Sequence, residues 1–113
     1  MNLDVSTREV GDVTVVAIAG EVDVFSAPAL RDEMNRVIAE GRTRLVADLT
    51  DVPFLDSTGL GVLVGRLKAV RQQQGELRLV IASDRLLRNF SITGLDKVFR
   101  IYPTADKALA DLS

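Results

Sequence analysis

The sequence of 113 residues contains no histidine and no cysteine. Without histidine, no imidazole can activate a serine as in the Ser–His–Asp hydrolases, and without cysteine there is no thiol nucleophile and no disulfide. Zinc sites built from imidazole or thiolate ligands are excluded as well. These two absences remove several large classes of enzyme and metalloprotein before any motif is considered.

The chain also has little excess charge and no long apolar run. Its formal net charge of -2 gives no general attraction to nucleic acid or to an anionic membrane. No apolar run approaches the ~18 residues that a membrane span needs. The first residues, Met1 to Val5, lack the basic and apolar regions of a signal peptide. We therefore expect a soluble, cytoplasmic protein that binds neither nucleic acid nor membrane directly.

The apolar residues that are present are spread evenly, which predicts a single domain over residues 1–113. Residues 3–10 are expected to form a short strand, and the almost wholly apolar, β-branched residues 13–19 a second one; the Gly-Asp turn signal between them predicts a hairpin. After residue 20, single strands alternate with helices, which predicts an α/β fold with a mixed, mostly parallel sheet of about five strands and about four helices. The further strands are expected at residues 44–50, 77–82 and 98–102, and the helices at 26–41, 57–75, 83–94 and 103–112.

Several polar and glycine residues predict how these helices begin, end and meet solvent. Serine accepts hydrogen bonds from free backbone N–H groups at a helix start, and glycine tends to end a helix. The predicted caps are Ser26 and Ser83, the predicted stops are Gly41, Gly75 and Gly94, and the expected solvated basic face is Arg66, Lys68 and Arg71.

A glycine-rich segment, residues 54–63, joins a predicted strand to a predicted helix. Asp56 and Ser57 are both good N-cap residues. Gly59 and Gly61 follow in the first turns, where a glycine costs about 1 kcal/mol relative to alanine. Their placement would leave the helix start bare, so that another molecule can approach the Ser57 hydroxyl. Tight packing of a capped helix against the sheet is the alternative interpretation.

Catalysis or nucleotide binding by this segment has little support. Ser57 would need a base, and Lys68 lies eleven residues further along the helix, about 16 Å away at ~1.5 Å per residue. The glycines from Gly59 to Gly65 nearly match a dinucleotide fingerprint, but the third comes one position late and the first lies too far from its strand. Phosphorylation by another protein needs only an exposed hydroxyl with small neighbours.

The sequence of residues 56–63, Asp-Ser-Thr-Gly-Leu-Gly-Val-Leu, resembles the phosphoacceptor motif of bacterial anti-sigma factor antagonists, small proteins of the STAS domain family. Two other segments agree with it: Gly-Glu-Val-Asp at residues 20–23, followed by Ala-Pro-Ala-Leu at 27–30, and Ile-Thr-Gly-Leu-Asp-Lys-Val-Phe at 92–99. The resemblance extends from about Leu3 to the C-terminus and implies the STAS fold.

The resemblance also implies a function. An anti-sigma factor that is itself an ATP-dependent serine kinase would bind the unphosphorylated chain and so release its sigma factor. Phosphorylation of Ser57 would end this binding, and a serine phosphatase would reverse it. Thr58 is the competing acceptor, but its β-branch makes it stiffer. The chain itself would be no enzyme and would hold no cofactor or metal. The implied partner-binding residues are Glu21, Asp23, Asp56, Ser57, Thr58, Gly59 and Gly61.

Asp23 has two interpretations. From the residues alone, it is a turn carboxylate bonded to nearby backbone N–H groups. The resemblance implies instead a partner contact beside Ser57. Loops that follow neighbouring parallel strands lie at one edge of a sheet, so the loops carrying Asp23 and Ser57 should share one surface. Two other functions stay open: a STAS-type scaffold module of a transporter or sensory complex that is never phosphorylated, and a small nucleotide-binding protein.

Overall fold

The computed structural model describes residues 3–112, whose five strands lie in one sheet in the order of the chain. The strands are β1 (Asp4–Val10), β2 (Val13–Ala19), β3 (Arg44–Asp51), β4 (Glu76–Val80) and β5 (Ile101–Tyr102). β1 pairs with β2 in antiparallel orientation, and every later pair is parallel. The predicted hairpin and the predicted mixed, mostly parallel α/β fold are therefore confirmed.

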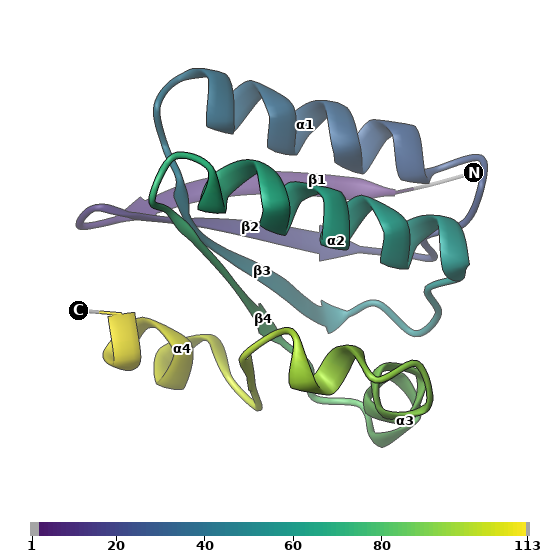
Figure 1. The fold of residues 1–113 in the computed structure, drawn as a ribbon. Helices are drawn as coiled ribbons and strands as arrows, with labels where there is room; N and C mark the ends of the chain where they lie inside the picture. The colour runs from purple at the N-terminus through teal and green to yellow at the C-terminus, as the bar shows by residue number, and fades with distance from the viewer. Residues whose placement is uncertain (1–2, 113) are drawn as a thin grey trace.

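Helices cover both faces of this sheet (Figure 1). α1 (Ala27–Ala39) and α2 (Ser57–Arg71) lie side by side on one face, and α4 (Ala105–Leu112) packs on the other face against β3, β4 and β5. α3 (Asp84–Ile92) and the short 3-10 helix η1 (Leu95–Lys97) connect β4 to β5. The last strand is shorter than the predicted 98–102, because Val98 and Phe99 belong to the turn that follows η1 and both donate to Leu95 O.

Two apolar cores result from this arrangement. The larger one joins β2, β3 and β4 to the inward sides of α1, α2 and α3, and it includes the predicted α1 stripe Leu30, Met34, Val37 and Ile38. The smaller one joins the other face of the same strands to α4 through Val13, Val15, Val46, Val80, Ala108 and Leu112. β2 is thus covered on both faces, which explains why its sequence is almost wholly apolar. No helix within residues 3–112 combines the length and the apolar character needed to cross a membrane.

Some predicted helix boundaries are confirmed. The Ser83 hydroxyl accepts a hydrogen bond from Leu86 N at 3.2 Å and caps α3. Gly94 follows that helix in the left-handed region at φ +76°. Gly75 is different, because α2 already ends at Arg71. A Cβ atom at Gly75 would lie 2.2 Å from the carbonyl oxygen of Thr43, so glycine is required there by close backbone packing.

Two further local predictions are wrong. Ser26 precedes α1 but makes no side-chain cap bond to it. Arg66 is half-buried and donates a hydrogen bond to Asn35 Oδ1 of α1, so it lies between the two helices and not on a solvated face. Lys68 and Arg71 are exposed, as predicted. Both errors concern side chains whose partners lie outside their own helix, which periodicity cannot reveal.

Candidate functional site at the start of helix α2

Two loops meet at the start of α2. The first, residues 20–26, follows β2, and the second, residues 52–56, follows β3. Val22 N donates to Phe54 O and Asp56 N donates to Val22 O, both at 3.0 Å, forming an isolated parallel bridge between the loops. The two loops therefore extend the parallel pairing of β2 and β3 beyond the sheet, and they share one surface as the strand order predicts.

Asp56 caps α2 and leaves Ser57 uncommitted. The Asp56 carboxylate accepts a hydrogen bond from Gly59 N at 3.0 Å, and its backbone has the extended conformation typical of an N-cap residue. Ser57 is the first residue of the helix and is exposed, as is Thr58. Within residues 3–112, the structure gives the Ser57 hydroxyl no hydrogen-bond partner. An exposed hydroxyl is thus presented at the positive end of a helix dipole.

The two glycines of the first turns have different roles. Gly59 is buried, and a Cβ atom there would lie 2.8 Å from Val22 Cγ1 and 2.9 Å from Leu55 Cγ. Its missing side chain lets α2 pack closely on the two loops, so the prediction that Gly59 keeps the surface bare is wrong. Gly61 is exposed, and a Cβ atom there would meet nothing within 4 Å. Of these two glycines, Gly61 is the one that leaves open space at the surface.

The Asp23 carboxylate braces its own loop. Its Oδ1 atom accepts hydrogen bonds from Phe25 N at 2.9 Å and Ser26 N at 3.0 Å. The hydrogen bond from the Ser26 backbone is the main reason why the pKa of Asp23 lies below its ordinary value. Asp23 is therefore a turn carboxylate, as one of the two interpretations expects. Its contact with a partner stays a prediction.

Ser26 completes this brace instead of capping α1. Its hydroxyl is buried, donates to the carbonyl oxygen of Glu21 at 2.8 Å and accepts from Asp23 N at 3.0 Å. A short polar side chain that can satisfy nearby backbone groups competes with the helix for them. The loop before α1 consequently has a fixed backbone held by its own residues.

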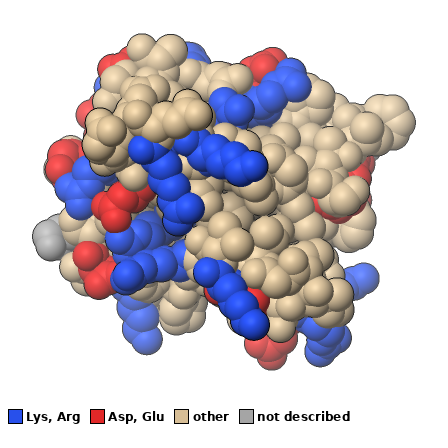
Figure 2. All heavy atoms as spheres, viewed as in Figure 1, with Lys and Arg blue, Asp and Glu red and all other residues tan. Residues whose placement is uncertain are grey.

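The surface around Ser57 is acidic. Residues 20–26 and 51–58 contain the acids Glu21, Asp23, Asp51 and Asp56 and no lysine or arginine. Figure 2 shows the same imbalance, since the region over the start of α2 is mostly tan and red and the blue side chains lie elsewhere. Within residues 3–112, no group of three acidic side chains is arranged to hold a metal ion.

Sequence reasoning missed the apolar part of this surface. The chain has four phenylalanines. Phe90 and Phe99 are buried in edge-to-face contact, with ring centroids 6.1 Å apart, whereas Phe25 is 78% exposed and Phe54 is 43% exposed. The available signal was the presence of an aromatic residue in each of the two loops predicted to share a surface.

Comparison with known proteins places this architecture in a family. Residues 4–108 match the model of the STAS domain, and the chain belongs to the STAS domain family. It is 44% identical over 101 residues to the anti-sigma-B factor antagonist of Bacillus subtilis (strain 168), covering 89% of this chain and 92% of that protein. The protein of the same name from Listeria monocytogenes is 41% identical over 102 residues, covering 89% of this chain and 90% of the other.

A solved structure agrees in fold and sequence. The crystal structure of an anti-sigma factor antagonist from Mycobacterium paratuberculosis superimposes with a TM-score of 0.90 at 34% identity, covering 97% of this chain and 93% of that one. The STAS fold expected from the sequence is therefore confirmed.

Proposed function

We propose that this chain is an anti-sigma factor antagonist whose binding to its partner is switched off by phosphorylation of Ser57. The observation that carries the proposal is the exposed Ser57 hydroxyl, left without a partner by the Asp56 cap. The names of the relatives at 44% and 41% identity support the same function. The partner is an anti-sigma factor that is also a serine kinase, and a serine phosphatase restores the active form.

The chain acts as ligand and substrate, and the partner supplies the chemistry. Phosphoryl transfer needs a nucleotide, a metal ion and a positioned base, all of which a kinase brings. The absence of histidine leaves Ser57 without its usual activating base. The work of this chain is therefore to present a hydroxyl on a rigid helix start, in the cytoplasm where sigma factors act.

The phosphate changes binding without refolding the domain. At a helix N-terminus, the dipole stabilises an anion by about 0.3–1 kcal/mol, so the fold tolerates the modification. Across the interface, the new charge of about -2 faces the phosphates of the kinase-bound nucleotide, because Ser57 must reach them to be modified. Like charges brought together at an interface cost several kcal/mol. At 1.4 kcal/mol per decade, about 3 kcal/mol weakens binding more than a hundredfold.

Phosphorylation mapping tests this proposal. The chain is incubated with ATP and the purified anti-sigma factor of its own host, and the product is analysed by intact mass spectrometry with fragmentation. The wild type and Thr58→Ala should each gain one phosphate, located on Ser57, whereas Ser57→Ala should gain none. Thr58 is the matched control because it is adjacent to Ser57 and is also exposed. A phosphate that persists in Ser57→Ala, or is absent from the wild type, would contradict the proposal.

A further inference from the structure

Exposed apolar side chains occur on the two loops that meet at the start of α2. Large exposed hydrophobic residues within residues 3–112 are Val10, Val24, Phe25, Phe54, Ile92 and Val98. Three of these six, Val24, Phe25 and Phe54, lie in or next to the two bridged loops at the start of α2. They contribute little to the core, so the folded domain alone gives no reason for their position. We call these three residues the apolar anchor.

The backbone beneath the apolar anchor is fixed. Phe25 N donates to Asp23 Oδ1 at 2.9 Å, and the carbonyl oxygen of Phe54 accepts from Val22 N at 3.0 Å. The buried Ser26 hydroxyl ties the same loop to Glu21 O. Because these bonds already order the loops, a partner that covers the apolar anchor loses little further conformational entropy. Aromatic side chains held in this way are typical of binding hot spots.

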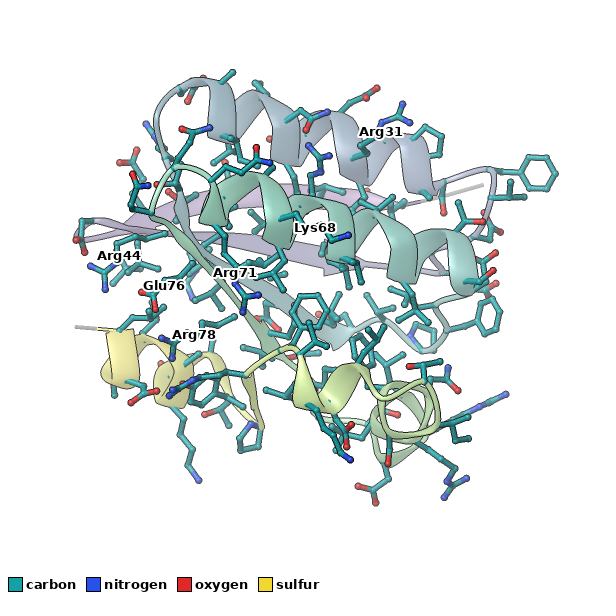
Figure 3. The ribbon with its side chains drawn as sticks, viewed as in Figure 1. Arg31, Arg44, Lys68, Arg71, Glu76 and Arg78 are labelled. Atoms are coloured by element: carbon teal, nitrogen blue, oxygen red, sulfur yellow. The ribbon has the colours of Figure 1, made fainter. Side chains whose placement is uncertain are left out.

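The charge around the apolar anchor restricts what can cover it. The flanking side chains Glu21 and Asp51 are exposed and acidic, and the two loops contain no basic residue. The labelled Arg44, Arg71 and Arg78 lie toward the opposite end of α2 (Figure 3). A second copy of the chain docked through the same surface would bring acid against acid, which disfavours self-association. Charge complementarity favours a partner with an apolar recess bordered by lysine or arginine.

We propose that Val24, Phe25 and Phe54 dock into such a recess on the anti-sigma factor and supply most of the affinity of the unphosphorylated form. This inference rests on the proposed function and identifies the surface that performs it. The apolar anchor holds the partner, and Ser57, two residues beyond the bridged Leu55, is thereby brought to the nucleotide of the kinase. The apolar anchor then supplies the binding free energy, and phosphorylation of Ser57 on the same surface controls it.

Affinity measurements on surface variants test the inference. Phe25→Ser, Phe54→Ser and the control Ile92→Ser are titrated by calorimetry, without ATP, against the purified anti-sigma factor of the host. Ile92 is the matched control because it is 77% exposed, close to the 78% of Phe25, but lies at the end of α3. Phe25→Ser should weaken binding by about 10- to 100-fold, since a buried phenylalanine is worth this much in transfer free energy. Ile92→Ser should stay within about twofold of the wild type, a change below the typical cost of losing a buried contact.

Kinetics and melting curves complete the test. With ATP present, Phe25→Ser should raise the KM for phosphorylation of Ser57 with little change in kcat, because the removed contact is made before and during the reaction alike. The melting temperatures of Phe25→Ser and Ile92→Ser should be unchanged, because both side chains are more than three-quarters exposed.

Each outcome separates the two proposals. If the wild type binds and both phenylalanine variants bind equally well, the apolar anchor is excluded and the proposed function stands. If wild-type chains self-associate in sedimentation and Phe25→Ser abolishes only that association, the occupant is a second copy and the inference is wrong. If the wild type binds no anti-sigma factor of its host, the proposed function fails and the inference fails with it.

Discussion

The two ends of helix α2 differ in whether the charged side chains around them are paired with opposite charges. At the end near Arg71, side chains of both signs neutralise one another beside a hollow of about 240 Å³. Arg78 contacts Glu76 at 2.5 Å and Asp111 at 3.0 Å, and it donates to the Tyr102 hydroxyl at 2.7 Å (Figure 3). At the end that begins with Ser57, acids and exposed aromatic residues occur without a basic residue in either loop.

This difference separates stabilising structure from a binding surface. The hydrogen bond from Arg78 is the main reason why the pKa of Glu76 is lowered, so this carboxylate stays charged within the fold. Charged side chains that are already paired within the domain offer little additional binding free energy to another protein. At the start of α2, charge of one sign and exposed apolar surface are both unfavourable in isolation, and a complementary partner can relieve both. We therefore assign stability to one end of the helix and recognition to the other.

The largest effect on stability is expected at the end of α2 near Arg71, from Gly75→Ala. The new methyl group would lie 2.2 Å from Thr43 O, a backbone atom that cannot move without shifting the start of β3. We expect a loss of about 3 kcal/mol in unfolding free energy, at the upper range for overpacking. Denaturant titration measures it, with Gly65→Ala as control because nothing lies within 4 Å of its Cβ position. Partner affinity per folded molecule should be unchanged; a lost affinity in fully folded Gly75→Ala would contradict the division between the two ends.

A smaller effect on stability, but a larger one on function, is expected from Gly59→Ala. Its Cβ would lie against side chains of Val22 and Leu55, which can shift more readily than backbone. We expect a loss of about 1–2 kcal/mol, since overpacking is only partly offset by the better helix propensity of alanine. Because Val22 bridges the two loops, phosphorylation of Ser57 should also slow.

Gly61→Ala is the matched control for Gly59→Ala. Open space at this position predicts a gain of about 0.5–1 kcal/mol in helix stability. If Gly61 gives the kinase access to Ser57, phosphorylation should slow although the protein is more stable. Equal stability changes for Gly59→Ala and Gly61→Ala would show that the close packing at Gly59 has been misjudged.

The smallest effect is expected from Asp23→Asn, which retains an acceptor but removes the charge. Hydrogen bonds lower the pKa of Asp23 in the folded state, so its stabilising contribution is present above the unfolded pKa of about 3.9 and disappears as the pH falls through the folded value. The wild type should therefore have a slightly higher melting temperature than Asp23→Asn at pH 7, and this difference should shrink as the pH falls below about 3.9. A difference independent of pH would mean that charge plays no part in bracing the loop.

The sequence predicts the elements of this fold well because their patterns are local. Alternating strands and helices predict the sheet, and the rule that loops after neighbouring parallel strands lie at one edge places the loops of Asp23 and Ser57 together. Asp56 was correctly counted among the good N-cap residues. The helix cap is decided within a few residues, whereas the shared surface of the two loops follows from the order of strands and helices along the chain.

Two of the failed predictions depend on contacts between distant segments. Gly59 is bare because Val22 approaches it from another loop, and Arg66 is turned inward by Asn35 of α1. Ser26 looks like a helix cap in the sequence, but its hydroxyl turns back to Glu21 O. The exposure of Phe25 follows from the brace around Asp23, which no periodic pattern encodes. Tertiary packing decides the first two, whereas hydrogen bonds within the loop of residues 20–26 decide the other two.

The most direct test is the affinity of two forms of the same chain for the purified anti-sigma factor of its host. Unphosphorylated protein and protein phosphorylated on Ser57 are titrated by calorimetry, and their circular dichroism and melting curves are compared. We predict dissociation constants that differ by more than about a hundredfold, with the fold unchanged. Equal dissociation constants, or weak binding that accompanies loss of structure, would contradict a switch that acts through the surface at the start of α2.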